Sequence, residues 1–153
     1  MTVLGARGRA AGPWSRDRFA IRLLAVLVAA GLGIDAVVHL SDAGLYAVPG
    51  GGLLTESHLF LAQSVVAFVV AILVLVRPGV ATFTAAVLVT ATAAAAVFIY
   101  TYVDVGAIGP LPDLYEPTWA LPGKRISAAA EVCGALLAAG GLVLCARRRH
   151  PQR

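Results

Sequence analysis

The sequence is short of charge. Only 13% of its 153 residues are Asp, Glu, Lys or Arg, whereas 59% are hydrophobic. Soluble domains carry about 25% charged residues. A chain this poor in charge does not suit a surface exposed to water, so the composition excludes an ordinary soluble domain and predicts an integral membrane protein.

Cysteine is also scarce. Cys133 and Cys145 both belong to the last apolar stretch, and on a helix this spacing separates them by about 18 Å, beyond disulfide reach. The chain has no Cys-x-x-Cys, so neither a thiol–disulfide relay nor a structural zinc site is indicated. We expect both cysteines to be small packing residues.

The common catalytic motifs are missing. The chain contains no Gly-x-Ser-x-Gly and no His-Glu-x-x-His, and the glycine run 50–52 is followed by leucines and not by a basic residue that would neutralise a phosphate. These absences favour a non-enzymatic protein, and no motif requires a cofactor. An intramembrane enzyme with acids as its only catalysts stays open.

Four apolar segments are each long enough to cross a bilayer, which takes about 20 helical residues. They cover approximately residues 19–41, 57–76, 80–104 and 125–146. We therefore predict an all-α fold, an integral membrane four-helix bundle. The predicted organisation is a disordered basic segment (1–14), the bundle (15–147) and a basic tail (148–153).

A net charge of +4 can suggest nucleic-acid binding, but the basic residues of this chain lie beside the predicted spans. Arginines that flank membrane spans are typical of cytoplasmic ends, where they contact anionic lipid. We predict that both termini and the turn at Arg77 are cytoplasmic, with lipid as a partner and no nucleic acid. The Ala-, Val- and Arg-rich usage suggests a bacterial plasma membrane. A basic lead before an apolar run also resembles a cleavable signal, but three further spans favour an uncleaved first helix.

Polar side chains form one stripe on the first segment. Gly31, Asp35, His39 and Asp42 follow spacings of three and four, which return to the same helix face. Asp35 and, in the fourth segment, Glu131 each lie about 9 Å inside the predicted outer boundary. A mid-span acid is disfavoured by about 2.5–3.5 kcal/mol on insertion scales, so it is rarely accidental. We predict that the two carboxyl groups face one cavity on the outer side.

Other groups at the same end extend this predicted pocket. Tyr100 and Asp104 share a face of the third segment, and the proline-rich loop 104–123 is stiff enough to act as a lid. The loop aromatics equally suit anchoring in the headgroup region. The predicted ligand or proton pocket consists of Asp35, His39, Tyr100, Asp104 and Glu131, and the possible lid residues are Tyr115, Glu116 and Trp119.

His39 and His58 are weak candidates for a metal or haem site, because the two residues lie at similar depths. Helix geometry turns His58 about 140° away from Gln63, the deepest polar residue of the second segment. If Gln63 faces the bundle, His58 faces lipid headgroups or a neighbouring protein. The faces therefore argue against a site shared by the two histidines.

Three functions remain open. The favoured one is a non-enzymatic membrane subunit or small-ligand binder, partnered by a second copy or by another membrane protein. The first alternative is a proton-coupled carrier in which Asp35 and Glu131 exchange protons with a cationic substrate; with four spans, it would have to act as an oligomer. The second alternative is a haem- or metal-binding redox protein that uses His39, with or without His58.

Overall fold

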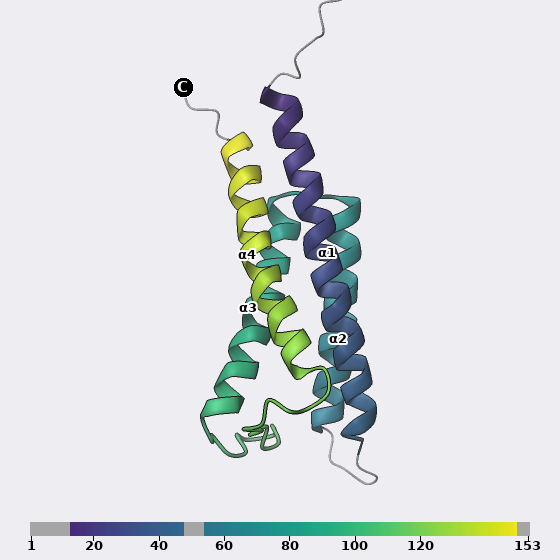
Figure 1. The fold of residues 1–153 in the computed structure, drawn as a ribbon, viewed down its shortest axis with the longest axis vertical. Coiled ribbons are helices and arrows are strands. Elements are labelled where there is room, and N and C mark those ends of the chain that lie inside the picture. Colours follow the sequence, from purple (N-terminus) through teal and green to yellow (C-terminus); the bar gives the residue numbers. More distant parts are fainter. Residues whose placement is uncertain (1–12, 48–53, 150–153) are drawn as a thin grey trace, which may run out of the picture.

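Four long helices make up most of the described chain (Figure 1). The computed structural model describes residues 13–47 and 54–149. The helices are α1 (Pro13–Leu45), α2 (Glu56–Val76), α3 (Val80–Tyr102) and α4 (Lys124–Arg149). The predicted all-α class with four helices is confirmed, and each helix is long and apolar enough to cross a membrane. Of the predicted terminal segments, residues 1–12 and 150–153 lie outside the described residues.

The helices form a bundle in the cyclic order α1–α2–α3–α4, with α1 and α4 as neighbours. α1 packs most extensively on α2 and next on α4, while α3 packs chiefly on α4 and less on α2. Both described ends of the chain and the α2–α3 turn lie at one end of the bundle, and the end of α1, the start of α2 and the 103–123 loop lie at the other (Figure 1). We name these the basic end and the loop end.

Local chemistry explains where the helices start and stop. The Thr55 side chain caps α2 by accepting a hydrogen bond from the backbone N–H of His58 (3.3 Å). α2 ends just before Pro78, which cannot donate to the helix ladder. Gly123 precedes α4 with φ +82° and lies so close to Val38 that an added Cβ would be 2.7 Å from its Cγ1. Only glycine suits both requirements.

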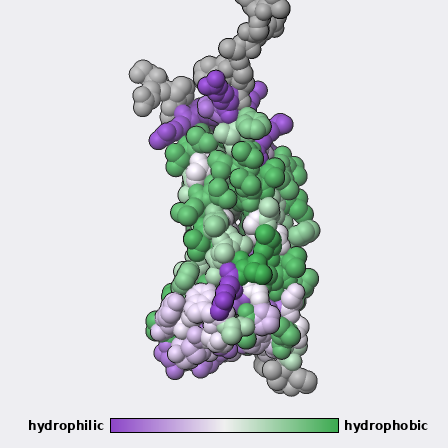
Figure 2. All heavy atoms as spheres, viewed as in Figure 1, coloured by the Kyte–Doolittle hydropathy of each residue, from purple (hydrophilic) through white to green (hydrophobic). Residues whose placement is uncertain are grey.

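The outer surface and the interior of the bundle differ in kind. Large apolar side chains such as Leu27, Val37 and Phe68 are exposed, and Figure 2 shows an apolar belt between two more polar ends. Such a belt is what a bilayer requires. The interior toward the basic end is apolar, with Val28, Leu32 and other side chains of α1 packed beside Phe83 of α3. Toward the loop end, the interior becomes polar.

Candidate functional site

Asp35 is the centre of the polar interior. Its side chain is fully buried, and three groups from three helices contact it. Gln63 of α2 donates through Nε2 to Oδ2 (3.0 Å), and the hydroxyl of Ser127 on α4 lies 3.2 Å from Oδ1. His39, one turn further along α1, places Nδ1 3.0 Å from Oδ1 and 3.0 Å from the Asp35 carbonyl oxygen.

Glu131 brings a second carboxylate to the same place. It lies one turn after Ser127 on α4, is only 1% exposed, and accepts a hydrogen bond from the Ser127 hydroxyl through Oε1 (2.7 Å). Its other oxygen, Oε2, is buried without a hydrogen-bond partner among the described residues. Since a hydroxyl has one proton, Ser127 can donate to Asp35 or to Glu131, but not to both at once.

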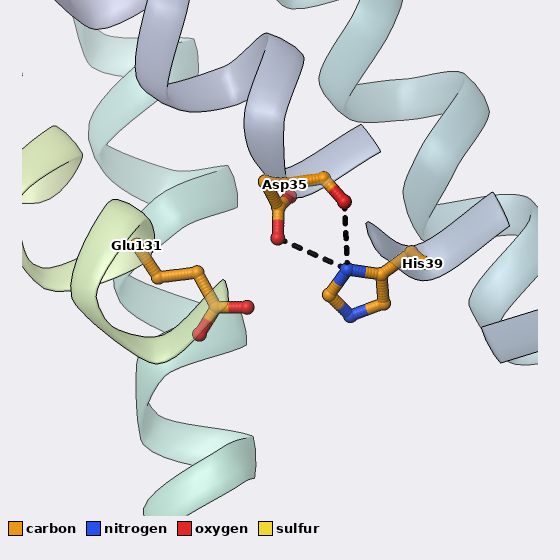
Figure 3. A group of neighbouring side chains, drawn as sticks. All are labelled: Asp35, His39 and Glu131. Carbon is orange, nitrogen blue, oxygen red and sulfur yellow. Dashed lines mark hydrogen bonds and ion pairs between the residues drawn. The ribbon is translucent and has the colours of Figure 1, made fainter. Parts of the chain in front are cut away.

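Asp35, His39 and Glu131 together form what we call the floor cluster. Each residue has a possible ligand atom, and these atoms all lie within 4.8 Å of one another. In Figure 3 the Glu131 carboxylate extends from α4 toward Asp35 and His39 on α1. With a neutral imidazole the floor cluster has two negative charges in a buried place, which is costly unless a cation or protons compensate them.

A cavity of about 310 Å³ opens above the floor cluster at the loop end. His39, Gln63, Ser127 and Glu131 belong to its lining, whereas Asp35 lies behind them. Most of the remaining lining is apolar and comes from α2, α3 and the 103–123 loop, for example Leu59, Phe60, Ala96, Val97 and Leu121. This combination of apolar walls and a few convergent polar groups is typical of small-molecule sites.

Three further acids line the cavity nearer the loop end: Asp42, Glu56 and Glu116. We call them the rim carboxylates. Among the described residues that line the cavity, Lys124 is the only Lys or Arg. The pKa of the Tyr46 phenol, which also lines the cavity, is raised, first by burial and then by the negative charges of the rim carboxylates. The cavity therefore has an electrostatic preference for cations.

The 103–123 loop covers part of the cavity, and hydrogen bonds to α3 and α4 hold it in place. The backbone N–H of Glu116 donates to the carbonyl oxygen of Tyr100 (2.9 Å), and the Lys124 ammonium group donates to the carbonyl oxygen of Glu116. Arg125 donates through Nε to the carbonyl oxygen of Trp119 (2.8 Å). The Trp119 ring packs beside Tyr102 and donates to its hydroxyl (3.2 Å).

The predicted pocket residues divide into two groups. His39, Tyr100 and Glu131 line the cavity, and Asp35 supports its floor. Asp104 lies apart, because α3 ends at Tyr102; its exposed carboxylate accepts a hydrogen bond from the backbone of Gly106 (3.1 Å).

Of the three predicted lid residues, one lines the cavity and two do not. Glu116 lines the cavity, whereas Tyr115 and Trp119 do not. His58 is exposed and belongs neither to the cavity lining nor to the floor cluster. Tyr46, which follows α1, and Glu56, the acid in the first turn of α2, also line the cavity, and the sequence analysis predicted neither as a pocket residue.

No protein-family model, curated protein or solved structure matches this chain. The class is therefore defined by the architecture and the site alone. The chain is a four-helix protein whose helices are long and apolar enough to cross a membrane, with a buried histidine–carboxylate cluster beneath an acidic cavity.

Proposed function

We propose that this is a multi-pass membrane protein that binds a small organic cation, without catalysing its conversion, in the cavity at the loop end. The observation that carries the proposal is the cavity itself: about 310 Å³, mostly apolar walls, and an excess of carboxylates over Lys and Arg in its lining. An amphipathic ammonium compound matches both properties, because its apolar part covers the walls and its charge meets the rim carboxylates.

The cavity faces the extracytoplasmic side in this proposal. Arginines gather at the opposite end of the bundle, where Arg18, Arg22, Arg148 and Arg149 surround a small hollow. Basic residues at one end of membrane helices favour a cytoplasmic location for that end. Both termini and the α2–α3 turn are then cytoplasmic, as expected in a bacterial plasma membrane, and a ligand reaches the loop end from outside.

Binding of a defined probe tests the proposal. Purified protein in detergent micelles is titrated with benzylammonium, and with benzyl alcohol as the neutral analogue, while thermal unfolding is followed. A bound ligand raises the apparent stability, so benzylammonium is expected to raise the melting temperature more than benzyl alcohol does. Equal shifts for the two compounds, or no shift at all, would contradict the proposal.

A pair of matched variants locates the binding. Ala96 lines the cavity, whereas its neighbour Ala95 is exposed on the outer face of α3. Ala96→Trp fills part of the cavity and is expected to remove the benzylammonium shift, while Ala95→Trp retains it. Neutralising two rim carboxylates with Glu56→Gln and Glu116→Gln should weaken binding of benzylammonium but not of benzyl alcohol.

A proton-coupled carrier is the second candidate, and one contact favours it. Asp35 and Glu131 both approach the single hydroxyl of Ser127, so a proton can be exchanged between two neighbouring acids. Uptake of a radiolabelled ammonium compound into proteoliposomes that depends on a proton gradient would support a carrier. Unchanged uptake with Asp35→Asn and Glu131→Gln would reject it.

A further inference from the structure

We infer that the floor cluster is a binding site for one divalent transition-metal ion of the zinc type. This inference goes beyond the proposed ligand binding and does not rest on it. Asp35 and Glu131 each offer a carboxylate oxygen and His39 an imidazole nitrogen, and these atoms lie within 4.8 Å of one another. Zinc binds imidazole nitrogen and carboxylate oxygen, and three protein ligands plus one open position is the ligand count of a zinc site that accepts a further ligand.

The unpartnered oxygen of Glu131 is the observation that points to a missing cation. Oε2 is buried without a hydrogen-bond partner among the described residues, and in Figure 3 the carboxylate is directed toward the other two residues. A buried carboxylate oxygen left in this way is strongly disfavoured. A divalent ion supplies the missing contact and neutralises both acids together.

Neighbouring side chains hold the three ligands in place. Gln63 donates to Oδ2 of Asp35, and Ser127 donates to Oε1 of Glu131. The oxygens available to a metal ion are then Oδ1 of Asp35, which lies 3.0 Å from Nδ1 of His39, and the unpartnered Oε2 of Glu131. The Nδ1–H of His39 donates to the backbone carbonyl of Asp35, which selects the tautomer whose Nε2 carries a lone pair. Supporting contacts of this kind orient metal ligands in known sites.

The cavity provides the path of entry. His39 and Glu131 belong to its lining, so an ion can reach the cluster from the loop end without opening the helix bundle. A water molecule or a donor atom of a cavity ligand can complete the coordination from that side. The ion would lie deeper than the rim carboxylates, so the two sites are separate in position and in chemistry.

Zinc titration of the full chain tests the inference. The chain is purified in detergent without an affinity tag, stripped with a chelator, and titrated with Zn²⁺ by isothermal calorimetry. One ion per chain is expected. Substitution of residues that merely support metal ligands weakens binding about 10–100-fold, so Ser127→Ala should show a loss of that size, and His39→Gln and Glu131→Gln a larger one.

Matched controls separate this site from surface binding. His58→Gln combined with His150→Gln leaves His39 as the only histidine in the chain, and this variant should bind zinc as wild type does. Asp104→Asn removes an exposed acid outside the cluster and should also have no effect. Circular dichroism checks that every variant is folded; should His39→Gln fail to fold, Glu131→Gln alone decides.

Two results would overturn the inference: no stoichiometric zinc uptake by the wild type, or uptake that persists with Glu131→Gln. In either case protons, and not a metal ion, compensate the two acids. The two proposals are separated on the wild-type chain, where zinc and benzylammonium are titrated in separate measurements. Loss of zinc binding with retained probe binding, or the reverse, shows which proposal has failed.

Discussion

The two halves of α4 use the same face of the helix for opposite purposes. In the half toward the loop end, the buried face carries Ser127 and Glu131, which meet Asp35 of α1. In the half toward the basic end, the buried face carries Gly141, beside which the ring of Phe83 on α3 is packed. One half presents polar groups to its neighbour, whereas the other presents Gly141 together with the small side chains of Ala138 and Cys145.

The difference shows how a bundle in lipid can hold an unfavourable polar cluster. Lipid is as apolar as the helix surfaces, so helices associate through close packing and interhelical hydrogen bonds. The half of α4 toward the basic end, which we call the glycine half, permits that close packing. In the half toward the loop end, which we call the polar half, carboxylates, an imidazole and an amide replace the apolar contact. We therefore expect substitutions in the glycine half to change stability, and those in the polar half to change binding.

Gly141→Ala should have the largest effect on stability. A Cβ at this position would lie 2.3–2.6 Å from three ring carbons of Phe83, a side chain that is itself fully buried. Overpacking of this kind costs about 1–3 kcal/mol, and we expect the upper part of that range. Thermal unfolding in micelles, followed by circular dichroism, measures the change.

The neighbouring glycine supplies the control for this prediction. A Cβ at Gly140 would meet nothing within 4 Å, so Gly140→Ala should be neutral or stabilising by up to about 1 kcal/mol through helix propensity. In the Gly141→Ala background, Phe83→Leu should restore part of the loss. If Gly140→Ala and Gly141→Ala proved equally tolerated, the close packing of this half would not be what holds the bundle together.

Loss of the contact between Gln63 and Asp35 should have the second-largest effect on stability. Gln63→Leu removes the donor to Oδ2 of a fully buried carboxylate, and a buried acceptor left without its partner costs about 1–3 kcal/mol. A double-mutant cycle with Asp35→Asn should show a coupling of about 1 kcal/mol. Strictly additive losses would mean that the two side chains act independently, in spite of their 3.0 Å separation.

Glu131→Gln should hardly change the stability of the metal-free protein. The substitution keeps the shape of the side chain and removes a buried negative charge whose Oε2 has no partner among the described residues. Replacing poorly compensated buried charges is often neutral or stabilising, so we expect a change within about 1 kcal/mol, toward greater stability. A large destabilisation, measured after chelator treatment, would instead indicate that Glu131 has a structural role.

Much of the fold followed from the sequence, because hydrophobic length alone identifies helices that can cross a bilayer. The predicted segments 57–76 and 80–104 lie within two residues of α2 and α3, whereas α1 extends beyond the predicted 19–41 at both ends and α4 ends three residues after 146. At α3 the apolar pattern continues to Val103, but the helix stops at Tyr102, where the backbone N–H of Glu116 donates to the Tyr100 carbonyl oxygen. A contact made by a residue far along the chain leaves no local signal.

The sequence predicted part of the candidate site, because residues on one helix face recur at a fixed spacing. Matching depth and helix spacing placed Asp35 and Glu131 at one level, and in the structure both approach the hydroxyl of Ser127. Spacing could not reveal the cavity, whose lining combines residues of all four helices with residues such as Leu114 and Pro122 from the 103–123 loop. Loop conformation depends on tertiary contacts and not on periodicity.

Asp17→Asn should have the smallest effect and extends the comparison to the far end of α4. Asp17 Oδ2 lies 3.6 Å from Nε of Arg148, with the Asp17 side chain half exposed. Exposed ion pairs contribute about 0.2–1 kcal/mol because water and salt screen them, so we expect a loss of about 0.5 kcal/mol or less that vanishes at high salt. Unfolding at low and high salt measures it. A larger, salt-independent loss would show that polar contacts also stabilise the basic end. The two halves of α4 would then not differ in what stabilises them.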